Sequence, residues 1–359
     1  MKKIVTVVGA RPQFVKAAAL SRVLRQQGRF QEVLVHTGQH FDENMSEIFF
    51  REMEISRPDH HLEINSLSHG AMTGRMMEML EKILGMEQPD FVLVYGDTNS
   101  TLAAALTASK MHIKLIHVEA GLRSFNMKMP EEVNRIVTDR LSQFLFCPSE
   151  TAMKHLEAEG FGRFPCHVSL SGDVMYDAAL YYASLSGEKA RLPAGIPPGE
   201  FILATLHRSE NTDDPVRLKS IVNALNRLNK SCPVVLPMHP RTKKALHKLG
   251  LHFEGVLTEP VGYFEMLELL KRCRLVMTDS GGLQKEAYFF KKHCVTLRDE
   301  TEWTELVQLG YNKLAGADEE KIMEAGAAML RKESDFSRQL FGDGKACEVI
   351  AKTLEEYSY

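Results

Sequence analysis

Short apolar runs alternate with longer amphipathic stretches along the first half of the chain. Runs rich in β-branched and aromatic residues lie at 3–9, 32–38, 90–96, 114–120 and 143–149. Their length and nearly continuous hydrophobicity are typical of buried strands in a parallel sheet. Between them, 13–28 and 69–87 carry apolar residues at helical spacing. This alternation predicts an α/β domain over residues 1–180.

The same pattern starts again in the second half. Apolar runs lie at 201–207, 233–239, 255–260, 275–280 and 294–297, and each precedes a stretch with helical character. Residues 181–199 are rich in Gly and Pro and are interpreted as a linker. A second α/β domain is predicted over 200–340, followed by a C-terminal helix within 341–359. Two Rossmann-like, doubly wound domains bind ligands at the carboxyl ends of their strands, which predicts an active site in the interdomain cleft.

Composition narrows the class of protein. The chain has 359 residues and a net charge of -3, values that suit two globular domains and give no sign of nucleic-acid binding. No run approaches the ~18 apolar residues of a membrane span. The start, MKKIVTVVG, is too short for a signal peptide and is predicted to be the first strand, so we expect a cytoplasmic protein. The six cysteines show no metal-binding spacing and are expected to be reduced, and no metal site is predicted.

Polar residues gather where the predicted strands end. A single polar residue there carries little information, but this number on one side of each sheet indicates a ligand-binding edge. In the first half they are Arg11, Gln39, His40, Asp97 and Glu119, and in the second half His207, Arg208, His239, Arg241, Asp279 and Ser280.

The stretch TDSGGLQKEA has the features of a phosphate-binding turn. Ser280, Gly281 and Gly282 open a predicted helix, whose free N–H groups suit an anion. A plain serine N-cap is the alternative. Glu286 lies further along the helix, where it could reach a ribose diol.

The matching turn of the first domain, VGARPQFVK, carries Arg11 and Lys16 but is neither GxGxxG nor a P-loop. Bound NAD or another cofactor is therefore not predicted. The basic residues of both domains would suit a diphosphate: they are Arg11, Lys16, His207, His239 and Arg241.

Three carboxylates, Asp97, Glu119 and Glu131, come from strand–loop junctions of the first domain. Asp97 could instead be a turn or cap residue, and Glu131 could be a first-turn acid with Arg135 as its i,i+4 partner. Taken together with Glu119 and a diphosphate site, they suggest acid–base chemistry on a nucleotide sugar.

The motifs GARPQFVK, TGQH, GDTNST, HVEAGLRS, PEEVNR, HRSEN, MHPRT and TDSGGLQKEA run nearly end to end. In this order the chain resembles the non-hydrolysing UDP-N-acetylglucosamine 2-epimerases. The resemblance implies a glycosyltransferase-B type (GT-B) fold, a homodimer, a C-terminal helix that packs on the first domain, and a UDP-sugar substrate. It implies catalytic roles for Asp97, Glu119, Glu131, Arg135 and His207. It implies UDP contacts for Arg11, Lys16, Ser280, Gly281, Gly282 and Glu286.

Three positions differ from the family pattern and bear on which sugar is the substrate. Gln13 stands where the family has glutamate, Trp303 where it has an arginine that contacts the nucleotide sugar, and Met266 where it has a phenylalanine near the uracil. These features look more like the branch that acts on UDP-2,3-diacetamido-2,3-dideoxy-glucuronate in bacterial surface polysaccharide synthesis. A carboxylate at C6 would need its own cation, for which Arg123 and Lys128 are the candidates. The substrate stays open between this sugar and UDP-N-acetylglucosamine.

Inversion at C2 constrains the mechanism, because that C–H is not next to a carbonyl. Without a redox cofactor, the remaining route is elimination of UDP to a glycal, followed by re-addition. Carboxylates would then move the protons, although the sequence does not show whether Asp97 or Glu131 is the base. The alternatives are a hydrolysing epimerase, a glycosyltransferase of the same fold, and a non-enzymatic nucleotide-sugar sensor.

Overall fold

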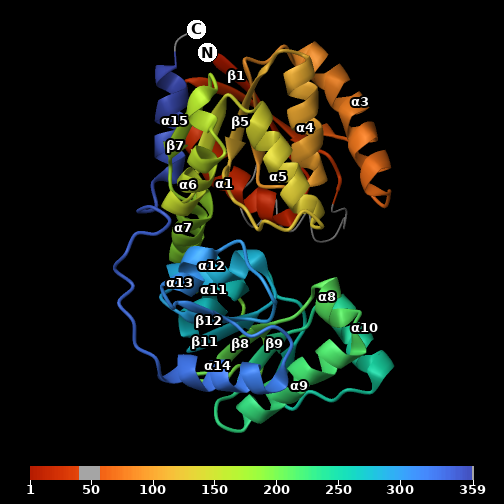
Figure 1. Cartoon of the computed structure of the whole chain (residues 1–359), viewed down its shortest axis with the longest axis vertical. Coiled ribbons are helices and arrows are strands. Elements are labelled where there is room, and N and C mark those ends of the chain that lie inside the picture. The colour runs from red at the N-terminus through yellow and green to blue at the C-terminus, as the bar shows by residue number, and fades with distance from the viewer. Residues whose placement is uncertain (40–56, 358–359) are drawn as a thin grey trace. The chain divides into compact units, whose positions relative to one another are not determined.

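The computed structural model describes residues 1–39 and 57–357. The chain forms two compact units: Met1–Leu180 with Gln339–Tyr359 is unit 1, and Tyr181–Arg338 is unit 2. Each unit is built on one parallel sheet with helices between the strands, as predicted (Figure 1).

The sheet of unit 1 has seven strands in the order β3-β2-β1-β4-β5-β6-β7. The chain first adds strands on one side of β1 and then on the other, so the switch point lies between β1 and β4. Ligands of doubly wound sheets bind at the carboxyl ends of the strands beside such a point. The strands are β1 (Lys2–Val8), β2 (Phe30–His36), β3 (His60–His61), β4 (Phe91–Tyr95), β5 (Lys114–Val118), β6 (Phe144–Cys147) and β7 (His167–Leu170).

The helices of unit 1 begin and end where sequence signals place them. Pro12 lies in the first turn of α1, and Gly28 closes it in the left-handed region at φ 64°. The predicted helix 69–87 is α3, and Pro130 opens α5. The bounds are α1 (Arg11–Gln27), α3 (His69–Glu87), α4 (Asn99–Lys110), α5 (Pro130–Leu141), α6 (Glu150–Ala158), η1 (Phe161–Arg163), α7 (Val174–Lys189) and α15 (Ala346–Glu356).

The C-terminal helix α15 belongs to unit 1. Both oxygens of Asp177 accept hydrogen bonds from its first turn, from the backbone N of Ala346 (3.1 Å) and of Cys347 (2.7 Å). At its other end, the ammonium of Lys2 donates to the carbonyl of Leu354 (2.7 Å). The expected C-terminal helix of the first domain corresponds to this element.

Unit 2 has six strands in the order β10-β9-β8-β11-β12-β13, with its switch point between β8 and β11. The strands are β8 (Ile202–Thr205), β9 (Val234–Pro237), β10 (Val256–Thr258), β11 (Leu275–Thr278), β12 (His293–Thr296) and β13 (Asn312–Leu314). The helices are α8 (Ser209–Thr212), α9 (Pro215–Asn229), α10 (Pro240–Leu249), α11 (Tyr263–Arg272), α12 (Gly281–Phe289), α13 (Thr304–Gln308) and α14 (Glu319–Arg331).

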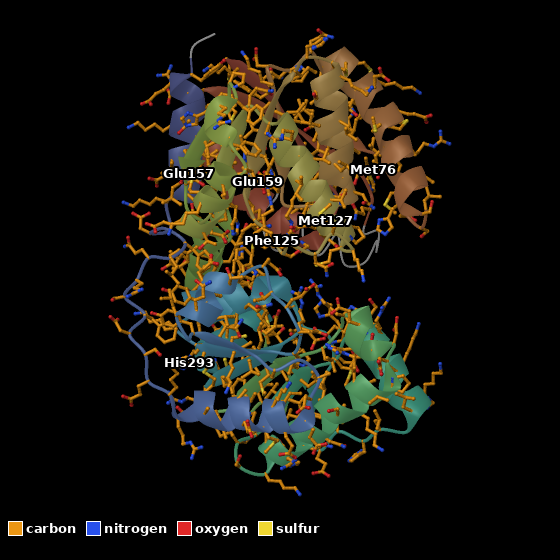
Figure 2. The ribbon with its side chains drawn as sticks, viewed as in Figure 1. Met76, Phe125, Met127, Glu157, Glu159 and His293 are labelled. Atoms are coloured by element: carbon orange, nitrogen blue, oxygen red, sulfur yellow. The ribbon has the colours of Figure 1, made fainter. Side chains whose placement is uncertain are left out.

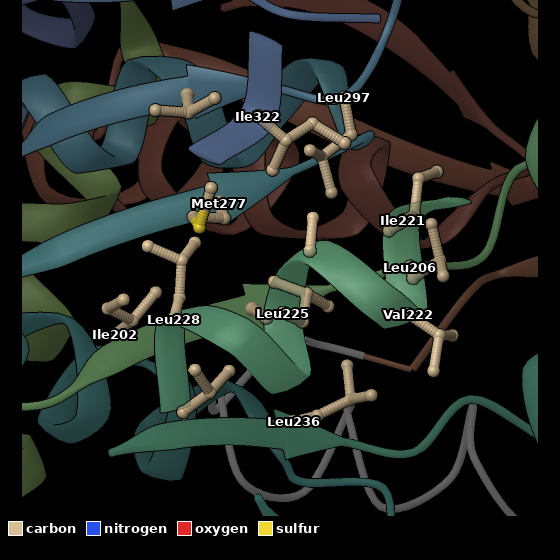
Figure 3. Packing of buried hydrophobic residues seen from close by; sticks show 14 of the residues in the cluster. Ile202, Leu206, Ile221, Val222, Leu225, Leu228, Leu236, Met277, Leu297 and Ile322 are labelled. Carbon is tan, nitrogen blue, oxygen red and sulfur yellow. The ribbon is translucent and has the colours of Figure 1, made fainter. Parts of the chain in front are cut away.

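The core of unit 2 fixes this sheet. Leu225 and Leu228 of α9 and Ile322 of α14 are fully or almost fully buried in one cluster with Met277 of β11 (Figure 3). Close packing of this kind holds the ends of β8 and β11 in place.

The structure differs from the sequence prediction at two kinds of position. The expected linker 181–199 is helical as far as Lys189, because α7 continues through it. The strands β3, β7 and β13 were not predicted. β7 is a short edge strand with partly exposed side chains, so it lacks the continuous apolar run of a central strand.

Candidate functional site

The predicted carboxylates of unit 1 lie at the carboxyl edge of its sheet. Asp97 follows β4, and Glu119 comes directly after β5. Lys16 comes from α1 and Arg135 from α5, so four elements contribute to one edge.

Glu119 forms an ion pair with Lys16, and both side chains are largely buried. The backbone of Glu119 has φ +76°, a left-handed conformation that is strained for a residue with a side chain. Gly96, next to this pair, has φ +61°, a left-handed conformation that favours glycine. Lys16 was expected to contact a diphosphate, but here it faces a carboxylate of its own unit.

Asp97 is held by two residues of α5. Its carboxylate accepts a 2.6 Å hydrogen bond from Arg135, and its backbone carbonyl accepts one of 2.9 Å from the amide of Asn134. The side chain of Asp97 stays 32% exposed, whereas that of Arg135 is 4% exposed. Arg135 also contacts the buried Glu132 at 3.1 Å. This leaves Asp97 oriented and open to a ligand.

The two glutamates that open α5 have different environments. Glu131, the predicted catalytic one, is exposed in the first turn. Glu132 is buried, and accepts hydrogen bonds from the backbone N of Ser124 (2.9 Å) and Phe125 (2.8 Å). Glu132 therefore shapes the β5–α5 loop, on which Phe125 and Met127 project as exposed side chains (Figure 2).

Arg123 does not fit its expected role as a substrate cation. It is 1% exposed, and its guanidinium donates to Glu159 (2.6 and 2.8 Å) and to Asp139 (2.7 Å). Burial disfavours its charge, but the two carboxylates outweigh burial and raise the pKa of Arg123. Arg123 thus stabilises the loop through buried ion pairs. Lys128, on the same loop, is an exposed cation.

Asp139 was not predicted, and it joins this loop to the sheet. It accepts hydrogen bonds from His117 (2.7 Å), Arg123 and the backbone N of Gly121 (3.1 Å). Burial would raise the pKa of Asp139, but the hydrogen bonds and charges of His117 and Arg123 hold it below its usual value. Because the other ring nitrogen of His117 lies 2.8 Å from the carbonyl of Gly96, the network also orders the turn before Asp97.

Gln13 lies at the edge of the sheet that carries the predicted site, but its side chain is buried among backbone groups. It is 2% exposed. Its carbonyl accepts from the backbone N of Gly9 and Ala10, and its amide donates to the carbonyl of Tyr95 (2.7 Å). Gln13 therefore ties the turn after β1 to the end of β4, which is the switch point itself.

In unit 2, His207 and Asp279 meet at the second switch point. His207 follows β8 and Asp279 follows β11, and their side chains lie 3.1 Å apart. Asp279 is fully buried, while the His207 side chain is 39% exposed. Burial would raise the pKa of Asp279, but the hydrogen bond and charge of His207 and the backbone N–H groups of His207 and Arg208 lower it. The pair presents an oriented imidazole at the edge of the sheet.

His239 and Arg241 lie at the start of α10 beside this pair. The ring of His239 is 5.6 Å from that of His207 and accepts from the backbone N of Arg241 (3.2 Å). The side chain of Arg241 is 47% exposed and contacts Asp213 at 3.4 Å. The structure thus places the rings of His207 and His239 close together, with Arg241 in the first turn of α10.

The turn into α12 has the geometry expected of an anion site only in part. Ser280 is the N-cap residue but makes no side-chain cap bond. The space beside Gly281 is taken by the carboxylate of Glu302, whereas a Cβ at Gly282 would meet open space. Glu286 is buried and accepts from the hydroxyl of Tyr263 (3.1 Å).

Trp303 supports this turn from the interior. It is 2% exposed, its indole N–H donates to the carbonyl of Gly281 (3.0 Å), and the ammonium of Lys285 lies 4.2 Å from its ring centre. The expectation that Trp303 stands at a sugar-contact position is therefore not supported. Met266 is partly buried against the core of unit 2.

Two predicted positions are described incompletely. His40 lies outside the described residues, and Arg11 is placed only by its backbone at the start of α1. Within residues 1–39 and 57–357, no group of three or more His, Cys, Asp or Glu side chains could hold a metal ion. No helix in this part of the chain is long and apolar enough to cross a membrane.

Two parallel α/β sheets, each with charged residues at its switch point, define a two-domain fold of the GT-B type. Comparison with known proteins gives the family. The model of the UDP-N-acetylglucosamine 2-epimerase family matches residues 22–355. The chain therefore belongs to this family, and it is a 2-epimerase, an enzyme of the isomerase class.

Individual relatives match over almost the whole chain. The UDP-2,3-diacetamido-2,3-dideoxy-D-glucuronate 2-epimerase of Pseudomonas aeruginosa is 54% identical over 98% of this chain and 99% of its own. The UDP-N-acetylglucosamine 2-epimerase of Methanocaldococcus jannaschii is 40% identical over 99% of this chain and 100% of its own. The crystal structure of a M. jannaschii UDP-GlcNAc 2-epimerase with UDP-GlcNAc and UDP has a TM-score of 0.89 at 39% identity, covering 98% of this chain and 99% of that one.

Proposed function

We propose that this chain inverts C2 of a UDP-2-acetamido sugar, and that UDP-2,3-diacetamido-2,3-dideoxy-D-glucuronate is its preferred substrate. The observation that carries the proposal is the switch-point edge of unit 1, where Asp97 and Glu119 are each held by a cation. The 54% identity to the P. aeruginosa enzyme supports the choice of sugar.

Unit 2 stabilises the UDP leaving group. His207, oriented by Asp279, and the half-exposed Arg241 supply groups that can stabilise a diphosphate as its charge grows. The first backbone N–H groups of α12, which begins at Gly281, have no acceptor within a helix and can take a phosphate oxygen. Glu286 is the candidate for the ribose, within reach of Tyr263.

The carboxylates of unit 1 carry out proton transfer at C2. Asp97 is oriented by Arg135 and partly exposed, which a base that must reach a substrate requires. The nearly buried Glu119 and Lys16 form the wall beside it, and the exposed Glu131 is the second carboxylate that can reach a ligand.

The bonds change as follows. The C1–O bond to UDP breaks and its electron pair leaves with UDP, while a carboxylate takes the C2 proton and the C1–C2 double bond forms. A proton then returns to C2 on the opposite face, and UDP re-adds at C1. No electrons are gained or lost, so no redox partner is needed. UDP must stay bound between the two steps, which is what separates this route from a hydrolysing epimerase.

The exposed β5–α5 loop supports the preference for a uronate. Because Arg123 is fully engaged, Lys128 is the cation on that loop that can pair with a C6 carboxylate. A charged hydrogen bond of this kind contributes ~1.5–3 kcal/mol, or roughly a ten- to hundredfold preference in kcat/KM.

Proton NMR of the purified chain with each UDP-sugar tests the proposal. In D₂O we expect the manno product, with UDP retained and deuterium at C2, and a higher kcat/KM for the uronate. Comparable kcat/KM values for the uronate and for UDP-N-acetylglucosamine would contradict the preference, and UDP-N-acetylglucosamine 2-epimerase would then be the better description. Accumulation of free UDP would show a hydrolysing enzyme, and no turnover of either sugar would favour a transferase or a sensor. The homodimer and the cytoplasmic location remain predictions of the sequence.

A further inference from the structure

A second cluster of charged residues lies at the amino ends of the strands of unit 2. It lines a pocket of about 410 Å³ between the segments that precede β8, β11 and β12. His207 and Asp279 lie at the carboxyl ends of β8 and β11, so this pocket is on the opposite edge of the same sheet. The substrate proposed above does not use it.

Positive charge dominates the pocket. Its cations are Arg272, Arg274, Lys291, Lys292 and Lys332, and its carboxylates are Glu200 and Glu333. The excess of cations stands out on a chain whose net charge is -3. Arg272 contacts Glu268 at 3.4 Å, and Arg274 reaches Glu200 only at 4.0 Å, so the acids present neutralise the cluster in part.

The walls of the pocket are fixed by the strap that follows α14, residues 332–338. The hydroxyl of Tyr311 donates to the carbonyl of Asp335, and that of Tyr288 to the carbonyl of Arg338, both at 2.5 Å. The ring of Phe336 lies 4.9 Å from Tyr311 and 5.3 Å from His293. Such anchoring preorganises the pocket, which reduces the entropy cost of binding.

His293 is one of the residues that line the pocket. It is 6% exposed, and its Nε2 lies 2.9 Å from the hydroxyl of Ser334. Burial lowers the pKa of His293, and the charges of Lys332 and Arg274 lower it further. A bound anion would offset these charges and raise the pKa of His293, so this pKa would show whether the pocket is occupied.

We propose that this pocket binds a compact, phosphate-bearing anion. Five cations line a concave site of small volume, and phosphate oxygens are acceptors that Arg and Lys side chains bind well. The site is independent of the epimerase reaction.

Imidazole NMR of the full-length chain with ¹³C-labelled histidine tests the proposal. Inorganic phosphate and diphosphate are titrated at constant ionic strength, and the His293 signal is assigned with His293→Gln. We expect a saturable shift of this signal and a rise in the pKa of His293. Diphosphate held at the opposite edge would move the signals of His207 and His239 instead.

The double variant Lys291→Gln/Lys292→Gln should weaken diphosphate binding at least ~10-fold, because charged hydrogen bonds are lost. The matched control is Lys219→Gln/Lys230→Gln, which neutralises two exposed lysines of the same unit. Lys291→Gln alone, at the exposed turn before β12, serves if the double variant does not fold. The absence of a saturable shift of His293, or an equal affinity in the pocket and control variants, would overturn the proposal.

Discussion

At the scale of single residues, the neighbours of a carboxylate decide what it can do. Asp97, Glu119, Glu131 and Glu132 all lie near one sheet edge, yet their environments differ. Asp97 is oriented and accessible, Glu119 is buried against Lys16, Glu131 is exposed, and Glu132 holds a loop. Chemistry is therefore assigned by exposure and partner, not by residue type.

Asp97→Asn and Glu119→Gln should each lower kcat by ~10²–10⁴-fold, the usual contribution of a proton-transfer group or of the charge that positions it. Turnover of the UDP-sugar by proton NMR measures this, and circular dichroism checks the fold. Glu157→Gln, an exposed glutamate on α6, is the control and should behave as wild type. Near-wild-type turnover of Asp97→Asn would remove that residue from the mechanism.

Neutralising Arg123 should affect folding more than sugar preference. Arg123→Gln leaves Asp139 and Glu159 without their shared cation, and breaking a buried pair of this kind costs ~3–5 kcal/mol. Urea unfolding measures the loss. Lys128→Gln should instead keep wild-type stability and erase the preference for the uronate. A stable Arg123→Gln enzyme with altered preference would reverse these assignments.

At the scale of elements, the C-terminal helix α15 packs on unit 1 through one of its faces. Ile350 is fully buried on that helix, while Val349 beside it is 39% exposed. Ile350→Ala should lower the free energy of unfolding by ~2–5 kcal/mol through lost burial and a cavity. Val349→Ala, the control on the same helix, should change it by less than ~0.5 kcal/mol. Equal effects of the two variants would mean that α15 does not dock through this face.

At the scale of the whole molecule, acid should weaken both units through one buried aspartate in each. The pKa values of Asp139 and Asp279 are lower in the folded chain than their ordinary value of ~3.9. Each therefore contributes stability that is fully present above about pH 4 and is lost as the pH falls through its folded pKa.

Urea unfolding at about pH 7, 5 and 3 should show this as a steep loss below ~4. Asp279→Asn should be less stable at neutral pH and show a shallower acid loss than wild type. An acid profile of Asp279→Asn that parallels that of wild type would contradict the role of this carboxylate.

The sequence by itself determined the fold class and the edge on which the site lies. Continuous apolar runs predict central parallel strands because both faces of such strands are buried, and β1, β4 and β5 follow them closely. Polar residues at the ends of these runs must share one edge of the sheet. For this reason Asp97, Glu119 and His207 could be placed from the pattern and the family resemblance alone.

Only the tertiary structure decided which of these residues can reach a ligand. Gln13 and Trp303 were expected near the substrate, and Arg123 as a substrate cation, but all three are buried in contacts with distant segments. Such contacts join residues far apart along the chain, and local pattern carries no information about them. Asp139 could not be predicted for the same reason, because its partner His117 lies in another segment of unit 1. The residues of the basic pocket likewise come from separate segments, which meet only when unit 2 folds.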